Sequence, residues 1–249
     1  MDLREELRGL PEKTQRMLNR GGVMVCFTAG QWLPDGISAM TPIRLIEEGE
    51  IEVVALLGSR ISTIYTFGPG EMVGLRPLLR PLSTPPIAFF AKTNVRCLEF
   101  DATFVRQQLI PGCAILRQLL EHYAHMRDLD IMMAAHPLFG TLSQQHREKL
   151  LAASEPQLFL EGELLLGSGS IEAPLFLIID GRVECYLDDE MHSEFGNGEV
   201  VGRFEAGGGE MRLLAKQVTK ALQLPRSLLQ ELCGDHRELC QRIRRLLPS

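Results

Sequence analysis

The chain has 249 residues, of which 45% are hydrophobic and 23% charged, a composition typical of one large or two ordinary globular domains. Its 32 acidic and 26 basic residues give a formal net charge of −6. That balance argues against a protein that coats nucleic acid or an anionic membrane through its overall charge. No apolar run approaches the roughly 20 residues of a membrane helix, and the acidic start at 2–6 is unlike a signal peptide. The six cysteines include no Cys-x-x-Cys pair, so we expect reduced thiols in a cytoplasmic protein.

The first half opens with a helix and continues as strands. Residues 10–18 (LPEKTQRML) carry an apolar pattern for a short helix, with Pro11 suited to its first position. Short apolar stretches follow at 23–27 and 51–57, separated by glycine turns, and Gly58–Ser59 is typical of a hairpin tip. Strands of this length and spacing predict a small antiparallel barrel or jelly roll.

A long helix is expected over 112–135. Its apolar residues recur near a period of 3.6, at Ile115, Leu119, Tyr123, Met126 and Ile131. His122 and His125 lie three apart on this helix and could share a metal ion. No third or fourth ligand is suggested, so we expect solvent-facing side chains and no metal site.

The same succession then recurs. Residues 142–150 predict a helix with Ser143 as its N-cap. The following strands and hairpin tip are expected at 175–179, 183–187 and Asp188–Asp189. Near the end of the sequence, an apolar pattern from Leu228 to Leu246 predicts an amphipathic helix, with Asp235 as a candidate N-cap.

The two halves are related by an internal repeat. Three pairs of segments share an offset of 132 residues: 10–18 with 142–150, 27–30 with 159–162, and 45–51 with 177–183. A fourth pair, 67–74 (FGPGEMVG) and 195–202 (FGNGEVVG), has an offset of 128, and the change falls inside an expected hairpin, where loop length can vary. Recurrence of glycines in one order over most of the chain indicates a duplicated domain.

This order of motifs resembles the cyclic-nucleotide-binding domain, present twice and covering nearly the whole chain. The family pattern is a helix, aromatic-x-x-Gly, Ile-x-x-Gly-x-Val, then Gly-Pro-Gly-Asp/Glu-x-x-Gly-Glu and an arginine-bearing loop. The resemblance implies a mainly β fold with flanking helices, made of two β-barrel (jelly-roll) domains joined by a long helix. The implied boundaries are 1–111 for the first domain, 112–135 for the linker helix, and 136–249 for the second domain with its C-terminal helix.

In that family, a phosphate-binding cassette follows the last glycine of the pattern. Backbone N–H groups and an arginine hold the cyclic phosphate, and a glutamate directly after the glycine accepts the ribose hydroxyl. The resemblance therefore makes the following residues the candidate ligand-binding set: Gly74, Leu75, Arg76, Arg80, Pro85 and Pro86 in the first half, and Gly202, Arg203, Gly209, Glu210 and Arg212 in the second.

The first half departs from the family at both key positions. Leu75 stands at the glutamate position, and Pro85 and Pro86 stand where the arginine and a small residue are expected. Leucine cannot accept the hydroxyl bond, and proline supplies neither a charge nor an N–H group. Arg76 and Arg80 could hold an anion in place of the missing arginine, or they could be exposed arginines of a loop.

The second half departs at the same two positions. Arg203 stands at the glutamate position and Gly209 at the arginine position, in a cassette about four residues shorter than the first. Arg203 could pair with Glu205 or Glu210 and close the pocket, which we favour because the shorter loop leaves less room. Arg212 could replace the missing cation only if the next strand shifted register, which would turn its side chains to the other face.

These departures predict a non-enzymatic regulatory protein that does not bind cyclic AMP in the orthodox way and acts on a protein partner. Helices 112–135 and 228–246 are its candidate interaction elements. The alternative is a sensor of a cyclic nucleotide or cyclic dinucleotide with altered specificity. No catalytic Ser/His/Asp or Cys/His set is recognisable, and no helix-turn-helix is expected after the last strand, so neither an enzyme nor a DNA reader is expected. We expect no cofactor, and a homodimer is a family-style expectation only.

Overall fold

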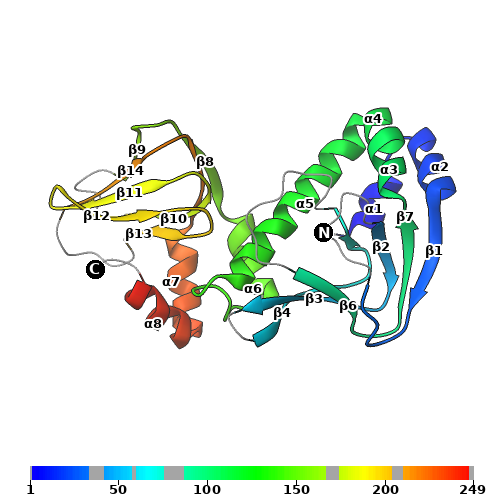
Figure 1. Ribbon diagram of the computed structural model, residues 1–249, viewed down its shortest axis with the longest axis horizontal. Coiled ribbons are helices and arrows are strands. Elements are labelled where there is room, and N and C mark those ends of the chain that lie inside the picture. Colours follow the sequence, from blue (N-terminus) through cyan, green and yellow to red (C-terminus); the bar gives the residue numbers. More distant parts are fainter. Residues whose placement is uncertain are drawn as a thin grey trace. The chain divides into compact units, whose positions relative to one another are not determined.

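The computed structural model describes residues 2–33, 42–57, 60–75, 87–166, 174–203 and 210–246. The expected hairpin tip at Gly58–Ser59 lies outside these ranges. The chain divides into two compact units, whose described parts are residues 2–131 and 132–246 with the gaps just given. Each unit contains two antiparallel sheets with helices beside them (Figure 1).

The first unit begins with two short helices and ends in a series of helical turns. Its helices are α1 (Leu3–Arg8), α2 (Glu12–Gly21), α3 (Ala102–Phe104), a π-helical turn (Val105–Leu109), α4 (Ile110–Gly112) and α5 (Ala114–Ala135). Asp2 caps α1 by accepting a hydrogen bond from the backbone N–H of Arg4. Pro11 immediately precedes α2, so it lies one position earlier than expected.

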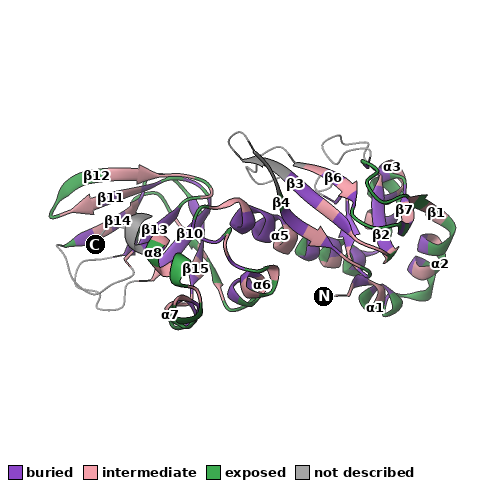
Figure 2. Ribbon diagram, turned by 90° about the horizontal axis from the view of Figure 1, so that it is seen from below, coloured by how far each residue is buried: buried purple, intermediate pink, exposed green. Residues whose placement is uncertain are grey.

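Seven strands of the first unit form two sheets. One sheet has the order β1 (Gly22–Phe27), β7 (Val95–Phe100), β2 (Ile43–Glu48) and β5 (Met72–Val73). The other has the order β4 (Arg60–Phe67), β3 (Ile51–Leu57) and β6 (Ile87–Ala91). Figure 2 shows that β2 and the described part of β3, residues 51–54, are largely buried, whereas α2 is mostly exposed.

The second unit repeats this plan. It begins with α6 (Gln144–Ala152), which Ser143 caps as expected. One sheet contains β13 (Val200–Gly202), β10 (Leu175–Asp180), β15 (Thr219–Leu224) and β8 (Glu155–Phe159), in that order. The other contains β12 (Glu190–Phe195), β11 (Val183–Leu187), β14 (Met211–Ala215) and β9 (Leu164–Leu166), in that order. Helices α7 (Arg226–Asp235) and α8 (Arg237–Leu246) follow.

The strand order confirms the repeat inferred from sequence. The order β1-β7-β2-β5 of the first unit corresponds, strand by strand, to β8-β15-β10-β13 of the second. Even the single bridge between Trp32 and Phe90 has a counterpart in the pairing of Leu164 with Leu214. Two antiparallel sheets in each unit form a jelly-roll arrangement.

Glycines with positive φ mark the same turns in both units. Among the described residues, eight glycines have positive φ, and they form four matched pairs: Gly30 with Gly162, Gly49 with Gly181, Gly70 with Gly198, and Gly74 with Gly202. The expected hairpin tip at Asp188 and Asp189 is also confirmed, since both residues have positive φ. The recurring glycines were therefore a reliable sequence signal because the backbone needs them at these turns.

Gly74 provides a direct test of this geometry. A Cβ atom at Gly74 would lie 2.4 Å from the carbonyl oxygen of Pro42, whereas one at Gly30 would meet nothing within 4 Å. The two glycines have nearly equal φ values, 87° and 83°, so their strain in the left-handed region is similar. We expect Gly74→Ala to reduce the free energy of unfolding by about 2 kcal/mol more than Gly30→Ala. Urea denaturation, followed by the fluorescence of Trp32, the only tryptophan, measures the free energy of unfolding of both variants. Equal losses of free energy in the two variants would contradict the close approach of residue 74 to the Pro42 carbonyl oxygen.

The long helix α5 occupies the expected position, but its buried stripe is shifted by one residue at its start. Leu116, Leu120 and Tyr123 are buried, whereas the expected stripe residue Ile115 is 60% exposed. The buried residues belong to one core with α1, α2 and the facing side of β2 and β7. The apolar side of α5 is therefore used within the first unit, at least as far as Ala124.

The C-terminal segment forms two helices where the apolar pattern predicted one. Helix α7 ends at Asp235 and α8 begins at Arg237. Asp235 is thus the last residue of α7 and does not cap a helix at its N-terminus. Five apolar residues of the two helices are buried: Leu228, Leu229, Leu232, Leu239 and Ile243.

Two further expectations concern membranes and metals. Within the ranges the structure describes, no helix is both long and apolar enough to span a membrane. In those same ranges, no group of three metal-ligating side chains comes together. His122 and His125 are both exposed.

Candidate functional site

The candidate site in the first unit starts at the end of β5. Gly74 turns the chain there, and Leu75, at the position where the family has its glutamate, is only 4% exposed. Leu75 belongs to the hydrophobic core that also contains Leu120, Tyr123 and Ala124 of α5. The position that would hold the ribose hydroxyl is therefore part of an apolar core.

A small cavity lies beside Leu75. Its walls are formed by Phe67, Met72, Val73, Gly74, Leu75, Phe89, Tyr123, Ala124, Arg127, Asp128 and Ile131. The cavity has a volume of about 30 Å³, whereas pockets for small molecules typically measure about 300–1,000 Å³. This space is about the volume of one water molecule in the liquid, roughly 30 Å³, and is far too small for a nucleotide.

The turn before β5 is held by the carboxylate of Glu71. Its Oε2 accepts a hydrogen bond from the backbone N–H of Gly68 at 2.8 Å, and its Oε1 accepts one from the Tyr65 hydroxyl at 3.0 Å. The guanidinium of Arg127 on α5 lies 3.4 Å from the same carboxylate. The side chains of Arg127 and Glu71 are only 12% and 15% exposed, so water screens this pair little.

Arg127 also ties the turn to two aromatic rings. It donates a hydrogen bond to the Tyr65 hydroxyl and lies over the rings of Tyr65 and Tyr123, at 5.4 and 5.2 Å from their centroids. The Tyr123 hydroxyl in turn accepts a hydrogen bond from the backbone N–H of Met72 at 3.0 Å. Burial raises the pKa of Tyr123, so its hydroxyl remains protonated at neutral pH. We call Tyr65, Glu71, Tyr123 and Arg127 the clamp, because they join α5 to the turn that leads into the first cassette.

The second unit has the same turn with a different set of side chains. Glu199, which matches Glu71, accepts a hydrogen bond from the backbone N–H of Gly196 at 2.6 Å. However, Glu199 is exposed, and Ser193 stands at the position of Tyr65. The turn therefore occurs in both units, whereas only the first unit has a tyrosine at the position of Tyr65.

In the second unit, Arg203 follows Gly202 at the end of β13. Burial raises the pKa of the Cys185 thiol, and the nearby positive charge of Arg203 lowers it in part. Cys185 is fully buried in the core of this unit, and Arg203 is half-buried, with its Nε atom inaccessible to water. Glu205, one of its two expected partners, lies outside the described residues.

Arg212 lies on the outside of the second unit. In β14 its neighbours Met211 and Leu213 point into the core and are buried, and the register pairs Arg212 with Tyr186. Arg212 forms an ion pair with Asp189 at the hairpin tip and lies 5.7 Å from the Tyr186 ring centroid. The strand keeps this register, with the guanidinium of Arg212 beside Asp189 and Tyr186.

The other candidate residues divide into two groups. Glu210 is exposed, and its backbone N–H donates a hydrogen bond to the Asp188 carboxylate at 2.8 Å, so it belongs to the hairpin tip. Arg76, Arg80, Pro85, Pro86 and Gly209 lie outside the described residues. The sequence analysis did not identify Tyr65, Glu71 and Arg127 as functional residues. Tyr65 could have been identified, because the second unit has Ser193 at the matched position within otherwise similar segments.

Comparison with known proteins gives one sequence relative and several structures of similar fold. No family model matches the chain. A cAMP-dependent protein kinase regulatory subunit from Mycosarcoma maydis is 28% identical over 172 residues, which is 68% of this chain. The chain spans only 29% of the length of that curated relative.

Two of the solved structures that the chain matches are the following. The regulatory domain of Toxoplasma gondii PKA, crystallised with cAMP, is 15% identical with a TM-score of 0.44, covering 96% of this chain and 92% of that one. The regulatory subunit of a cAMP-independent protein kinase A from Trypanosoma brucei is 19% identical with a TM-score of 0.42, covering 94% and 85%. Strand order and matched glycines show one fold present twice in tandem, and the sequence relative is a cAMP-dependent protein kinase regulatory subunit.

Proposed function

We propose that this chain is a non-enzymatic regulatory protein whose first cyclic-nucleotide-binding unit is held together by its own side chains in place of a nucleotide. The observation that carries this proposal is the burial of Leu75 in a core shared with α5, beside a cavity of about 30 Å³. A ligand of nucleotide size would have to displace this core. The unit then serves as a fixed scaffold that acts through contacts with a protein partner.

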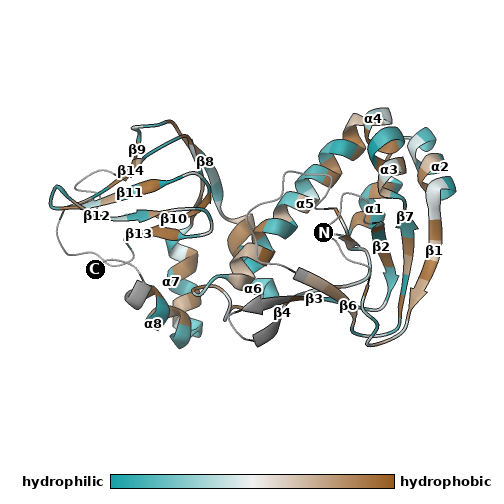
Figure 3. Ribbon diagram, viewed as in Figure 1, coloured by the Kyte–Doolittle hydropathy of each residue, from teal (hydrophilic) through white to brown (hydrophobic). Residues whose placement is uncertain are grey.

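The surfaces available for such contacts differ from those expected. Five apolar residues of α7 and α8, from Leu228 to Ile243, are buried. Leu116 and Leu120 of α5 are buried as well, in the core of the first unit. Exposed apolar residues lie instead on β1, which is hydrophobic along most of its length (Figure 3), where Val23 and Met24 are 64% and 50% exposed. The strand β1 ends its sheet, and an exposed sheet edge is a common site for strand addition by a partner.

Calorimetric titration of the full chain with cyclic AMP, cyclic GMP and cyclic di-GMP tests the proposal. We expect no heat of binding at nucleotide concentrations up to about 1 mM, since a filled apolar site gives no compensation for desolvating a phosphate. Micromolar binding of a nucleotide that also changes Trp32 fluorescence would contradict it, because Trp32 lies in the first unit.

A second candidate function rests on Arg203. Arg203 is half-buried, with its Nε atom inaccessible to water, at the position where the family has a glutamate, so this unit could hold an anionic ligand of altered kind. In that case one of the three nucleotides would bind to the full chain, and Arg203→Gln would abolish the binding. Arg212→Gln is the matched control, since that guanidinium faces outward and pairs with Asp189.

A further inference from the structure

A second hollow in the first unit lies away from the cassette, between α1, α2 and the sheet. It is lined by Arg4, Leu7, Arg8, Gln15, Leu18, Asn19, Leu45, Glu47, Leu98 and Phe100. Its volume is about 310 Å³, which reaches the lower end of the range for small-molecule pockets, about 300–1,000 Å³. At roughly 30 Å³ for each water molecule, this is space for about ten of them.

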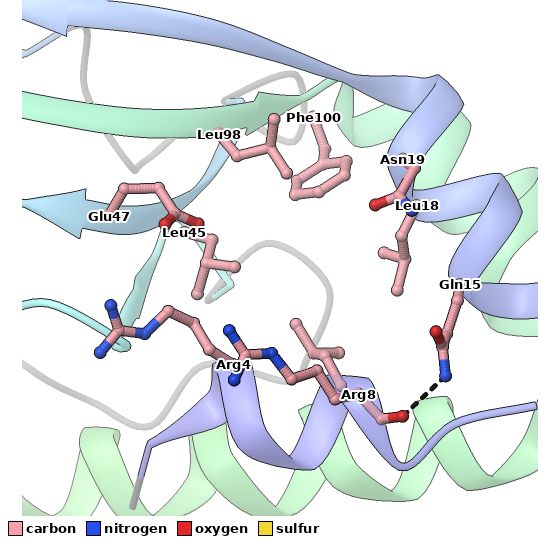
Figure 4. Close-up of a pocket in the computed structure, with 10 residues that line it drawn as sticks. Arg4, Arg8, Gln15, Leu18, Asn19, Leu45, Glu47, Leu98 and Phe100 are labelled. Carbon is pink, nitrogen blue, oxygen red and sulfur yellow. Dashed lines mark hydrogen bonds between the residues drawn. The ribbon is translucent and has the colours of Figure 1, made fainter.

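The hollow has an apolar floor and a polar rim. Leu7, Leu18, Leu45 and Phe100 form the floor with Leu98, and each of the four is at most 9% exposed. Figure 4 shows the guanidinium groups of Arg4 and Arg8 together on one side of the hollow, across from Leu98 and Phe100. A ligand that fills this space must therefore combine an apolar body with a polar end.

The charges on the rim favour an anionic group near Arg8. Arg4 is already paired with Asp2, at 2.8 Å between Nη2 and Oδ2. Arg8 is exposed, and in the described part of the chain no carboxylate lies within ion-pair distance of it. Glu47 also lines the rim, so a ligand with more than one negative charge is disfavoured. This arrangement suits a single carboxylate.

The corner between α1 and α2 is held by two hydrogen bonds from the side chain of Gln15. The side-chain amide of Gln15 donates to the carbonyl oxygen of Arg8 at 2.6 Å (Figure 4) and to that of Leu10 at 2.7 Å. Its N–H donors are thus used to hold the two helices together at the mouth of the hollow. The walls are therefore set by the fold before any ligand arrives.

The second unit carries different side chains at two of the matched positions. Phe139 and Arg147 stand 132 residues after Leu7 and Gln15, and Phe139 is fully buried while Arg147 is 5% exposed. Arg147 donates a hydrogen bond to the Leu142 carbonyl at 2.7 Å, the counterpart of the bond from Gln15 to Leu10. Larger buried side chains thus replace Leu7 and Gln15 in the second copy.

Two residues on the rim of the hollow also differ between the two units. Gly140 and Ile179 of the second unit stand 132 residues after Arg8 and Glu47. At these matched positions the first copy therefore has a smaller floor residue, Leu7, and charged rim residues, whereas its floor residue Phe100 is larger than the matching Leu224. We propose that this hollow binds a small amphipathic monocarboxylate, with its apolar body on the leucine floor and its carboxylate at Arg8.

Thermal unfolding of the full chain, followed by Trp32 fluorescence, tests this site with octanoate as the probe. We expect octanoate to raise the midpoint, since binding to the folded state alone stabilises it, and octanol to have little effect. Leu7→Phe, which copies the second unit, should abolish the shift. Arg8→Gln should weaken octanoate binding about tenfold, the effect of losing one charged contact of about 1.4 kcal/mol.

Arg20→Gln is the matched control, because Arg20 is an exposed arginine of α2 that does not line the hollow. It should leave octanoate binding unchanged. Absence of any octanoate effect, an equal effect of octanol, or full binding by the Leu7→Phe variant with an unchanged unfolding midpoint of its own would each overturn the proposal.

Discussion

Replacing Arg127 by methionine is expected to lower the free energy of unfolding of the first unit by about 3 kcal/mol. The substitution keeps the length of the side chain but removes the guanidinium that joins Glu71 to the Tyr65 hydroxyl. Glu71 would then be a largely buried carboxylate without its cationic partner, and breaking a buried ion pair in this way typically costs about 3–5 kcal/mol. Urea denaturation followed by Trp32 fluorescence reports this unit.

Arg117→Met on the same helix is the matched control. Arg117 pairs with Glu121 at 2.7 Å, but the two side chains are 61% and 47% exposed, and such surface pairs contribute about 0.3–0.5 kcal/mol. Equal effects of the two substitutions would mean that the clamp does not hold α5 to the turn.

Restoring the family's residue at the first cassette should be harmful. We expect Leu75→Glu to cost about 4 kcal/mol, because it removes a buried leucine and places a carboxylate in an apolar core. The glutamate of the family pattern would thus destabilise this chain, since Leu75 is 4% exposed among apolar neighbours.

Met24→Glu is the control for this second substitution, since Met24 is 50% exposed on the edge strand β1 of the same unit. It introduces the same charge at a site where water solvates it, and we expect a change within about 0.5 kcal/mol. If Leu75→Glu were as mild as Met24→Glu, the pocket would be open and the scaffold account would be wrong.

Much of the fold could be predicted because the repeat places the same backbone constraints twice. A glycine at a positive φ is required by the turn, so Gly70 and Gly74 recur as Gly198 and Gly202 despite changes around them. The loss of the cassette glutamate could also be predicted, because Leu75 and Arg203 stand directly after matched glycines.

The clamp could not be predicted because its parts come from elements distant in sequence. Tyr65 and Arg127 are 62 residues apart, and nothing in the sequence alone shows which face of α5 the turn meets. The break between α7 and α8 was missed for a related reason, since the apolar pattern continues across His236 without a proline to interrupt it.

A buried charge inside the first roll illustrates the same limit. Arg44 is only 3% exposed, pairs with Glu99 at 2.7 Å and lies 5.3 Å from the ring centroid of Phe27. Its counterpart in the second unit is Phe176, which packs against Phe159. Strand alternation predicts an inward residue at this position, but the pairing that makes an inward arginine tolerable depends on a neighbouring strand.

Hydrogen exchange of the full chain with and without cyclic AMP tests the central claim most directly. The backbone N–H of Met72 donates to the buried Tyr123 hydroxyl, so the segments 68–75 and 120–131 should be protected in the protein alone, and 1 mM cyclic AMP should leave their exchange unchanged. Rapid exchange of these segments without nucleotide and protection on its addition would contradict the account, because the ligand, and not the clamp, would then hold α5 to the turn.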